Sequence, residues 1–255
     1  MSDLSQIKDD LVTANRILAY HHVVDSFGHV SIRHPDNPNH FLMSRARAPN
    51  CVEIGDIMEF KHDGTVVGHE PGKPYSERFI HGAVYEARPD VMAVVHNHSP
   101  NVVPFTVQSK KKMRPIMHMC APIGTDIPTW DIAHKFGATN LLVTSIDMGR
   151  DLAATLGKRT VALMRGHGSV VVGKSLRDVV FTSVYMEINA DMLIKAYQLG
   201  EGEVVSMSEE EVAKNAGGRA GFTYERGWEN WCRLVDRPYY AMDWNMGPGF
   251  SKTDK

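Results

Sequence analysis

The chain has 255 residues, of which 43% are hydrophobic and 23% are charged, and its formal net charge at pH 7 is −2. This length supports one substantial core or two small ones, and the composition excludes low-complexity disorder for most of the chain. The near-zero charge argues against a nucleic-acid-binding protein, and no apolar run approaches the roughly 20 residues that span a bilayer.

The first half of the chain alternates predicted helices and short strands. Apolar residues at helical spacing predict an amphipathic helix in residues 4–18, and this N-terminus lacks the basic start and apolar core of a signal peptide. The segments HVSIR and HFLMS flank the turn PDNPN and predict a β-hairpin, and Asp63-Gly64 marks a second hairpin turn. A helix capped by Ser76 then precedes a buried strand, VMAVVHNH, and SPNVVPFTVQS begins another helix.

The second half has a similar mixture. The segment IMHMCAPIG predicts a strand and turn, and WDIAHKFG and MGRDLAATLG predict short helices that end at glycine. TVALMRGHGSVVVG predicts two strands around a tight turn, and Ser175 caps a long helix. Ser208 and Glu211 form a capping box for one more helix. AGGRAG predicts a hinge, after which we expect an aromatic-rich end to dock on the body or on a neighbouring subunit; its aromatic residues are Trp228, Trp231, Tyr239, Tyr240 and Trp244.

This order of elements predicts a mixed α/β single domain with a mostly antiparallel central sheet flanked by helices. The three cysteines, Cys51, Cys120 and Cys232, are odd in number and lie outside any CxxC pair. They favour a reducing compartment, so we expect a cytoplasmic protein without disulfides.

The thirteen histidines are the unusual feature of the composition, and three of them lie where predicted strands end. Side chains alternate along a strand, so His96 and His98 point together while Asn97 points away. An isolated pair of this kind favours two partly exposed histidines. His167, between two glycines at the end of another apolar strand, changes the balance, because three imidazoles on rigid supports form a set that suits Zn²⁺, Mn²⁺, Fe²⁺ or Co²⁺.

Glu77 lies at the start of the helix that precedes the strand with His96. A helix N-terminus favours a carboxylate, and a capping glutamate is the simpler interpretation of Glu77 taken alone. Near a metal ion, the same residue is a candidate fourth ligand or a base.

These residues lie in motifs that together resemble the class II aldolase/adducin family. The motifs are SFGHVS, the Ser-Glu pair at Ser76 and Glu77, ARPDVMAVVHNHSP and ALMRGHG, and the resemblance covers roughly residues 8–200. It implies a class II aldolase-like domain in residues 1–205, followed by a C-terminal helix and aromatic-rich tail in residues 206–255. It also implies a homotetramer with active sites at subunit interfaces.

The resemblance assigns roles to individual residues. It implies that His96, His98 and His167 bind a divalent metal ion, with Mn²⁺ or Zn²⁺ expected first and Fe²⁺ or Co²⁺ as alternatives. It implies that Glu77 is the acid/base or a further ligand. The family's enzymes break carbon–carbon bonds: an aldolase expels an aldehyde, and a decarboxylase expels CO₂.

Two segments depart from the sugar-phosphate aldolases. His29 occupies the first glycine turn, where those enzymes typically have asparagine, and SRARAP places Ser44, Arg45 and Arg47 in the second segment. Arginines suit bidentate recognition of carboxylates, although they bind phosphate too, and each is also explained as a surface cation or a structural ion pair. On a strand the two arginines would share one face, and the sequence does not choose between them.

This pattern resembles the branch that decarboxylates hydroxy-methylpyridine dicarboxylate and dihydroxyphthalate. We therefore expect decarboxylation of a hydroxylated aromatic or heteroaromatic carboxylate, in which protonation of a ring carbon gives a keto form and loss of CO₂ restores aromaticity. His29, Ser44, Arg45, Arg47 and Ser76 are the candidate substrate-binding residues. His118 is a candidate acid/base, with a strand-end histidine as an equally good explanation.

Three other functions remain open on the sequence. A class II aldolase would cleave a hydroxy-keto acid or a sugar phosphate, and an iron-dependent oxygenase would use the same ligands. An adducin-like interaction module would have no activity, but such relatives generally lack the complete set of three histidines and a glutamate.

Overall fold

The computed structural model describes residues 4–68, 70–200, 202–218 and 222–241. Within them, the strands form one eight-stranded sheet in the order β4-β3-β2-β1-β5-β8-β7-β6. Neighbouring strands are antiparallel except β6 and β7, which run parallel. The strands are β1 (His29–Arg33), β2 (His40–Ser44), β3 (Ile57–Lys61), β4 (Val66–Val67), β5 (Ala93–Asn97), β6 (Thr129–Trp130), β7 (Val161–Met164) and β8 (Gly168–Gly173).

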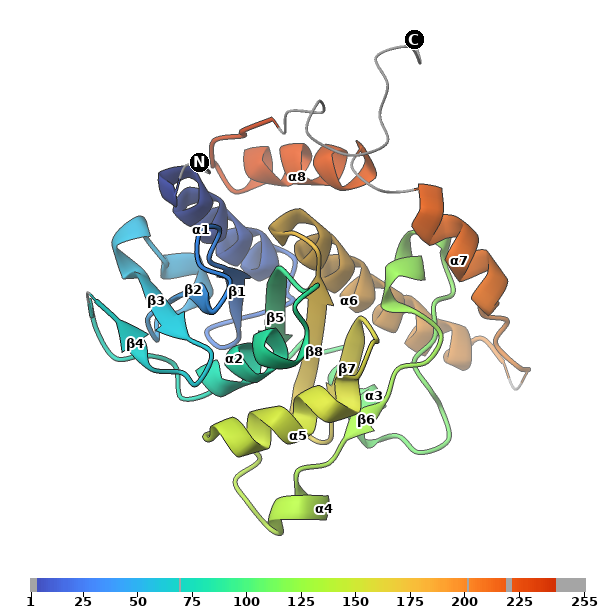
Figure 1. Cartoon of the computed structure of the whole chain (residues 1–255). Helices are drawn as coiled ribbons and strands as arrows, with labels where there is room; N and C mark the ends of the chain where they lie inside the picture. Colours follow the sequence, from blue (N-terminus) through green and yellow to red (C-terminus); the bar gives the residue numbers. More distant parts are fainter. Residues whose placement is uncertain (1–3, 69, 201, 219–221, 242–255) are drawn as a thin grey trace.

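Helices cover both faces of this sheet (Figure 1). The α-helices are α1 (Leu4–Tyr20), α2 (Arg78–Ala87), α3 (Val103–Val107), α4 (Ala133–Phe136), α5 (Ile146–Leu156), α6 (Leu176–Gln198), α7 (Glu209–Gly218) and α8 (Phe222–Leu234), and the 3₁₀ helices are η1 (Pro49–Cys51), η2 (Ile54–Asp56) and η3 (His118–Ile123). None of the described helices is both long and apolar enough to cross a membrane.

The alternation of side chains along the strands divides the core into two layers. Leu42, Val95 and Val171 face one cluster, which holds the apolar stripes of α1, α6 and α8. Their neighbours Phe41 and Val94 face the other, which holds α2 and α5. Both sheet faces are therefore buried, which explains the nearly continuous apolar runs of the central strands. The mixed α/β fold with a mostly antiparallel sheet is confirmed.

Most local predictions are confirmed as well. The two hairpins form, and Gly64 adopts the positive φ (82°) that a tight turn needs. The hydroxyl of Ser175 accepts from the N–H of Asp178 to cap α6. Ser208 and Glu211 exchange the two bonds of a capping box.

The predicted strand in IMHMCAPIG is wrong, because its second part is the 3₁₀ helix η3. The segment before η3 is bonded to a side chain and not to a strand: Asn189 of α6 accepts from the N–H of Ile116 and donates to the carbonyl of Arg114. Pro122 inside η3 has no N–H to give to a sheet.

Three boundaries also differ from expectation. Trp130 belongs to β6, so the helix predicted over WDIAHKFG shrinks to α4. The arginines lie beyond the end of β2 at Ser44 and are not on a strand. The predicted hinge AGGRAG starts within α7, which runs to Gly218, and its last three residues lie outside the described part of the chain, as does Trp244.

The last described segment, residues 222–241, packs on the body through α8. Trp228 is fully buried against the cluster that includes α1 and α6, and Trp231 is nearly so. Burial of these two tryptophans explains why α8 packs on the layer formed by α1 and α6.

Candidate metal centre

The two histidines of the HNH segment converge because of strand geometry. His96 is the fourth residue of β5, and His98 follows the strand's end, two residues further on, so both side chains point to one side. Asn97 points to the other, where its Oδ1 accepts from the hydroxyl of Ser169 at 3.0 Å. The prediction that His96 and His98 face together is confirmed.

The turn between β7 and β8 brings His167 to the same place. Gly166 has a positive φ of 64°, which favours glycine. Gly168 packs so closely on β5 that a Cβ there would lie 2.0 Å from the carbonyl oxygen of Asn97. The two glycines therefore set the imidazole between them against the end of β5, as the sequence predicts.

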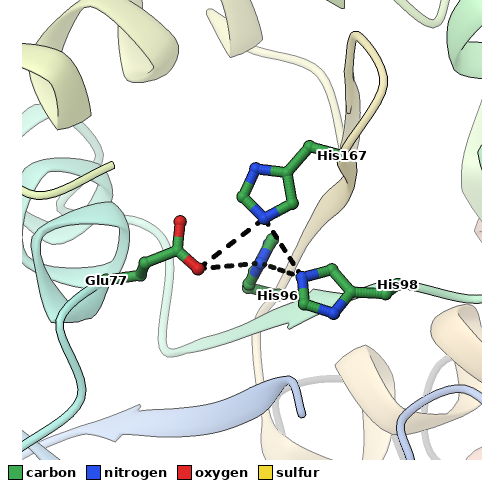
Figure 2. Close-up of side chains that lie close together, drawn as sticks. All are labelled: Glu77, His96, His98 and His167. Atoms are coloured by element: carbon green, nitrogen blue, oxygen red, sulfur yellow. Dashed lines mark hydrogen bonds and ion pairs between the residues drawn. The ribbon is translucent and has the colours of Figure 1, made fainter. Parts of the chain in front are cut away.

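Glu77 completes the group, and Figure 2 shows the four side chains pointing toward one another. Nε2 of His98 lies 3.1 Å from Nε2 of both His96 and His167. Glu77 Oε2 lies 3.7 Å from Nε2 of His96 and 3.6 Å from that of His167. One nitrogen or oxygen from each residue falls within 4.8 Å of all the others.

The backbone fixes the orientation of Glu77. This residue is the N-cap of α2 but makes no side-chain cap. Its Oε1 accepts from the N–H of Val143 at 2.9 Å, which turns Oε2 toward the histidines. Burial alone would raise the pKa of Glu77, but the hydrogen bond to His167, the nearby His96 and the Val143 N–H lower it to about 2. Ser76, predicted as the cap, is exposed beside it, so that prediction is wrong.

The donor set fits a divalent cation. The Nδ1–H of His96 donates to the carbonyl of Ser169 at 3.1 Å, which leaves the lone pair on Nε2. Burial lowers the pKa of His96 and of His98, so both imidazoles are neutral near pH 7. Zn–N bonds of 2.0–2.1 Å in a tetrahedron place ligand nitrogens roughly 3.3 Å apart, close to the observed spacing.

His29 lies next to this group and belongs to a buried chain of hydrogen bonds. It is paired with His96 across β1 and β5, and the two ring centroids are 5.1 Å apart. Its Nδ1 lies 2.6 Å from Nε2 of His81, whose Nδ1 lies 2.6 Å from Oγ of Ser31. Ser31 is in turn 2.8 Å from the hydroxyl of Tyr85.

The two predicted arginines meet at one carboxylate. Asp56 accepts from Nε of Arg45 and from a terminal nitrogen of Arg47, both at 2.6 Å. Each arginine side chain is about one-third exposed, at 31% and 35%. Tyr75 joins this loop to the site, because its hydroxyl donates to the carbonyl of Arg47 while its ring lies 4.6 Å from that of His29.

A cavity of about 750 Å³ reaches the group at His98. Its walls come from residues 22–26, from the segment 48–51 that follows the arginines, and from residues 234–236 at the end of α8. Ser44 is buried at the end of β2, before this segment. The structure does not bring His118 here: it is exposed and lines a separate cavity with Tyr185 and Trp231.

Several residues of the site were not predicted. Asp56 lies 9 residues after Arg47, but no local pattern predicts that it binds both arginines. Ser31, His81 and Tyr85 did leave a pattern, because His29 and Ser31 share one face of a strand while His81 and Tyr85 are four apart on a helix.

Three histidines at strand ends and a glutamate at the start of a helix thus form a site of the metal-binding type.

The family model of the Class II Aldolase and Adducin N-terminal domain matches residues 9–194. Decarboxylase tropJ of Talaromyces stipitatus is 32% identical over 250 residues, covering 88% of this chain and 92% of that protein. The 3,4-dihydroxyphthalate decarboxylase of Arthrobacter keyseri is 25% identical over 233 residues, covering 88% and 91%.

A solved structure shows the same fold. The aldolase II superfamily protein from Pseudomonas syringae superposes with a TM-score of 0.77 at 23% identity, covering 92% of this chain and 94% of that one. The chain belongs to the class II aldolase and adducin family. The names of the relatives agree on the lyase class, which confirms the prediction of an enzyme that acts on carbon–carbon bonds.

Proposed function

We propose that this protein is a divalent-metal-dependent carboxy-lyase that decarboxylates a hydroxylated aromatic or heteroaromatic carboxylate. The observation that carries the proposal is the convergence of three imidazole Nε2 atoms and Glu77 Oε2 within 4.8 Å. His96, His98 and His167 would hold the ion, which we expect to be Mn²⁺ or Zn²⁺, with Fe²⁺ or Co²⁺ as alternatives. When bound, such an ion supplies Lewis-acid stabilisation of negative charge on a substrate oxygen.

The protein's own groups provide the remaining steps. Decarboxylation replaces a carboxylate with a proton on the ring carbon, so one group must deliver that proton. Glu77 Oε2 lies among the ligands while Oε1 is held by the backbone, so this carboxyl is the proposed proton carrier, or a ligand that substrate displaces. His29, beside His96, is the proposed contact for a substrate oxygen.

The arginine loop supports a substrate with a second carboxylate. Arg45 and Arg47 are partly exposed and share Asp56, so either one can turn one guanidinium edge to a ligand while the other holds the loop. Ser44 and Ser76 are proposed to bind the substrate near them. The relatives named as decarboxylases, one of them for a dihydroxyphthalate, support this choice over a sugar phosphate.

The assembly, the division of the chain and the location in the cell are part of the proposal. We propose a homotetramer with active sites at subunit interfaces, formed by a lyase domain in residues 1–205 and a C-terminal part in residues 206–255. A role for His118 as acid/base depends on that tetramer, because within one chain His118 lies on a different cavity from the histidine group. A cytoplasmic location suits the three free cysteines.

The first experiment is metal analysis by elemental mass spectrometry, on protein purified without chelator or affinity tag. We expect near one divalent ion per chain in the wild type and almost none in His98→Ala, because loss of a ligand costs more than the 10–100-fold typical of an outer-shell residue. The matched control is His134→Ala, which removes a histidine whose side chain is 85% exposed. Equal metal content in all three proteins would contradict the site.

The second experiment assigns the reaction. The protein loaded with each of the four ions is supplied with hydroxyaromatic mono- and dicarboxylates, and CO₂ release is measured. Release from none of them would reject the decarboxylase. Release of pyruvate or dihydroxyacetone phosphate from aldol substrates would then identify an aldolase, and uptake of oxygen would identify an oxygenase. A metal-free, inactive protein would point to the adducin-like module.

A further inference from the structure

A chain of four buried polar side chains begins beside the metal centre and runs away from it. In order, it consists of His29, His81, Ser31 and Tyr85, joined by contacts of 2.6, 2.6 and 2.8 Å. None of the four is more than 3% exposed. Buried polar groups are costly unless each is satisfied, so the directions of these hydrogen bonds are constrained.

The fold places these residues together through two periodicities. His29 and Ser31 lie two apart on β1 and face α2, while His81 and Tyr85 lie four apart on α2 and face β1. The strand pairing sets His29 opposite His96 and Ser31 opposite Val94. The pairing of β1 with β5 therefore fixes His29, the first member of this hydrogen-bond series, beside the strand that carries His96.

The direction of these hydrogen bonds follows from Tyr85, the member of the series farthest from the metal centre. The Tyr85 hydroxyl carries one hydrogen, burial raises its pKa well above the ordinary value, and Ser31 Oγ is the one acceptor within reach among the described residues. Tyr85 therefore donates to Ser31. The hydrogen of Ser31 then goes to Nδ1 of His81, because if His81 donated from Nδ1 instead, Ser31 Oγ would accept from both neighbours and its own hydrogen would be buried without an acceptor.

The two histidines follow in turn. His81 accepts at Nδ1, so in its neutral form it carries its hydrogen on Nε2 and donates it to Nδ1 of His29. His29 then accepts at Nδ1 and must carry its own hydrogen on Nε2. That nitrogen has no partner among the described residues, and the ring that bears it lies 5.1 Å from the ring of His96 and 4.6 Å from that of Tyr75.

We infer that the chain Tyr85–Ser31–His81 fixes His29 in its Nε2–H tautomer, so that His29 is a hydrogen-bond donor to an anionic oxygen of the substrate. The inference rests on the proposed function for the identity of the substrate, but the tautomer itself does not depend on it. Ser31 and His81 are positioning residues, because they act through His29. The tautomer with hydrogen on Nδ1 would instead present a lone pair to the substrate oxygen and repel it.

A donor fixed in this way stabilises charge that develops during the reaction. It needs no reorganisation, because a carbonyl or carboxylate oxygen that gains electron density meets a hydrogen already in place. Removing one such donor in other enzymes costs about 10²–10³-fold in kcat. The Nε2–H of His29 thus suits a substrate in which the oxygen next to the breaking bond becomes an anion.

Ser31 and Tyr85 offer a matched pair of variants. In Ser31→Ala, Nδ1 of His81 loses its donor, and neither direction of the remaining bond is favoured. In Tyr85→Phe, Ser31 keeps its hydroxyl and His81 remains its acceptor, so the direction is preserved. The two variants each remove one oxygen from the same chain but predict different tautomers at His29.

The test is nitrogen-15 solid-state NMR of Zn²⁺-loaded protein labelled at the histidine ring nitrogens, with His29 assigned by difference from His29→Gln. We expect the Nε2–H pattern in the wild type and in Tyr85→Phe, and a mixture of tautomers in Ser31→Ala. An Nδ1–H pattern in the wild type, or a Ser31→Ala spectrum identical to it, would overturn the inference. Circular dichroism confirms that each variant is folded.

Kinetics test the role separately, on whichever substrate the protein turns over. His29→Gln keeps an N–H at the end of the side chain, whereas His29→Leu keeps only the bulk, so we expect the leucine variant to lose about 10²-fold in kcat and the glutamine variant clearly less. Equal losses would reject the donor role. A correct tautomer in a protein that releases no CO₂ would reject the proposed reaction and leave the positioning chain standing.

Discussion

Two groups of buried polar side chains lie on opposite faces of the sheet, and they differ in whether the chain itself supplies the opposite charge. Around Glu77, three imidazoles and a carboxylate all turn electron pairs toward one point. Under α8, acids face arginines: Arg177 lies 3.2 Å from Glu225, and Arg237 donates to Asp9. Tyr239 adds a hydrogen bond of 2.7 Å to Glu225.

The difference indicates what each group is for. A carboxylate and three imidazole nitrogens directed at one point suit a cation between them, so the group around Glu77 fits the metal ion proposed above. The group under α8 contains both signs of charge, and it joins α1, α6 and the segment that follows α8. We therefore expect changes in the first group to alter metal binding, and changes in the second to alter stability alone.

The largest expected effect on stability comes from Arg177→Met. This change removes the guanidinium that lies 3.2 Å from the buried carboxylate of Glu225, and removal of one partner from a buried ion pair typically costs about 3–5 kcal/mol. We expect the free energy of unfolding, measured with urea, to fall by this amount while the metal content of the folded protein is unchanged.

A second variant separates charge from packing. In Arg177→Met with Glu225→Gln, the buried negative charge is gone and the amide oxygen still accepts from Tyr239, so most of the lost stability should return. A double variant as unstable as the single one would show that Arg177 acts through its other contacts, which are its bond to the carbonyl of Tyr240 at 2.6 Å and its packing 5.4 Å from the ring of Trp228.

The next largest expected effect is a gain in the free energy of unfolding when the histidine group binds a metal ion. Zn²⁺ at about 100 times its dissociation constant should add about 2.7 kcal/mol to the free energy of unfolding. For a chain of this size that raises Tm by roughly 5–10 °C in a thermal scan. In His167→Ala the shift should vanish, and in His134→Ala it should persist; a shift that survives in His167→Ala would place the ion elsewhere.

The histidine group was largely predictable from sequence, because each of its parts depends on local geometry. Alternation along β5 sets His96 and His98 on one side, and Gly166 permits the turn that carries His167. What could not be predicted is the partner of Glu77, since the N–H of Val143 comes from a loop 66 residues away.

The arginine loop and the strand predicted near residue 118 show the same limit. Asp56 follows Arg47 by 9 residues, yet no pattern in the sequence between them predicts that its carboxylate holds both arginines. The segment before η3 has the composition of a strand, but Asn189 of α6 binds its backbone and replaces the sheet partner. Local patterns predict elements, and long-range side-chain contacts decide where those elements end.

The charged group under α8 is such a long-range contact, and Asp10 within it gives the smallest predicted effect. One oxygen of Asp10 is buried without a hydrogen bond, and burial, with Asp9 and Glu225 nearby, raises its pKa to about 6 despite Arg177. The folded state therefore binds a proton that the unfolded state has already released between about pH 4 and pH 6, so stability falls as pH rises through that window.

Replacement of Asp10 by asparagine should remove this cost. We expect Asp10→Asn to be more stable than the wild type by about 1–2 kcal/mol at pH 7.5, after allowance for partial exposure, and no more stable at pH 4. Urea unfolding of both proteins at the two pH values measures the difference. A gain of equal size at both pH values would mean that the amide makes new hydrogen bonds, and no gain at pH 7.5 would mean that Arg177 and Arg237 already neutralise Asp10 as they do its neighbours.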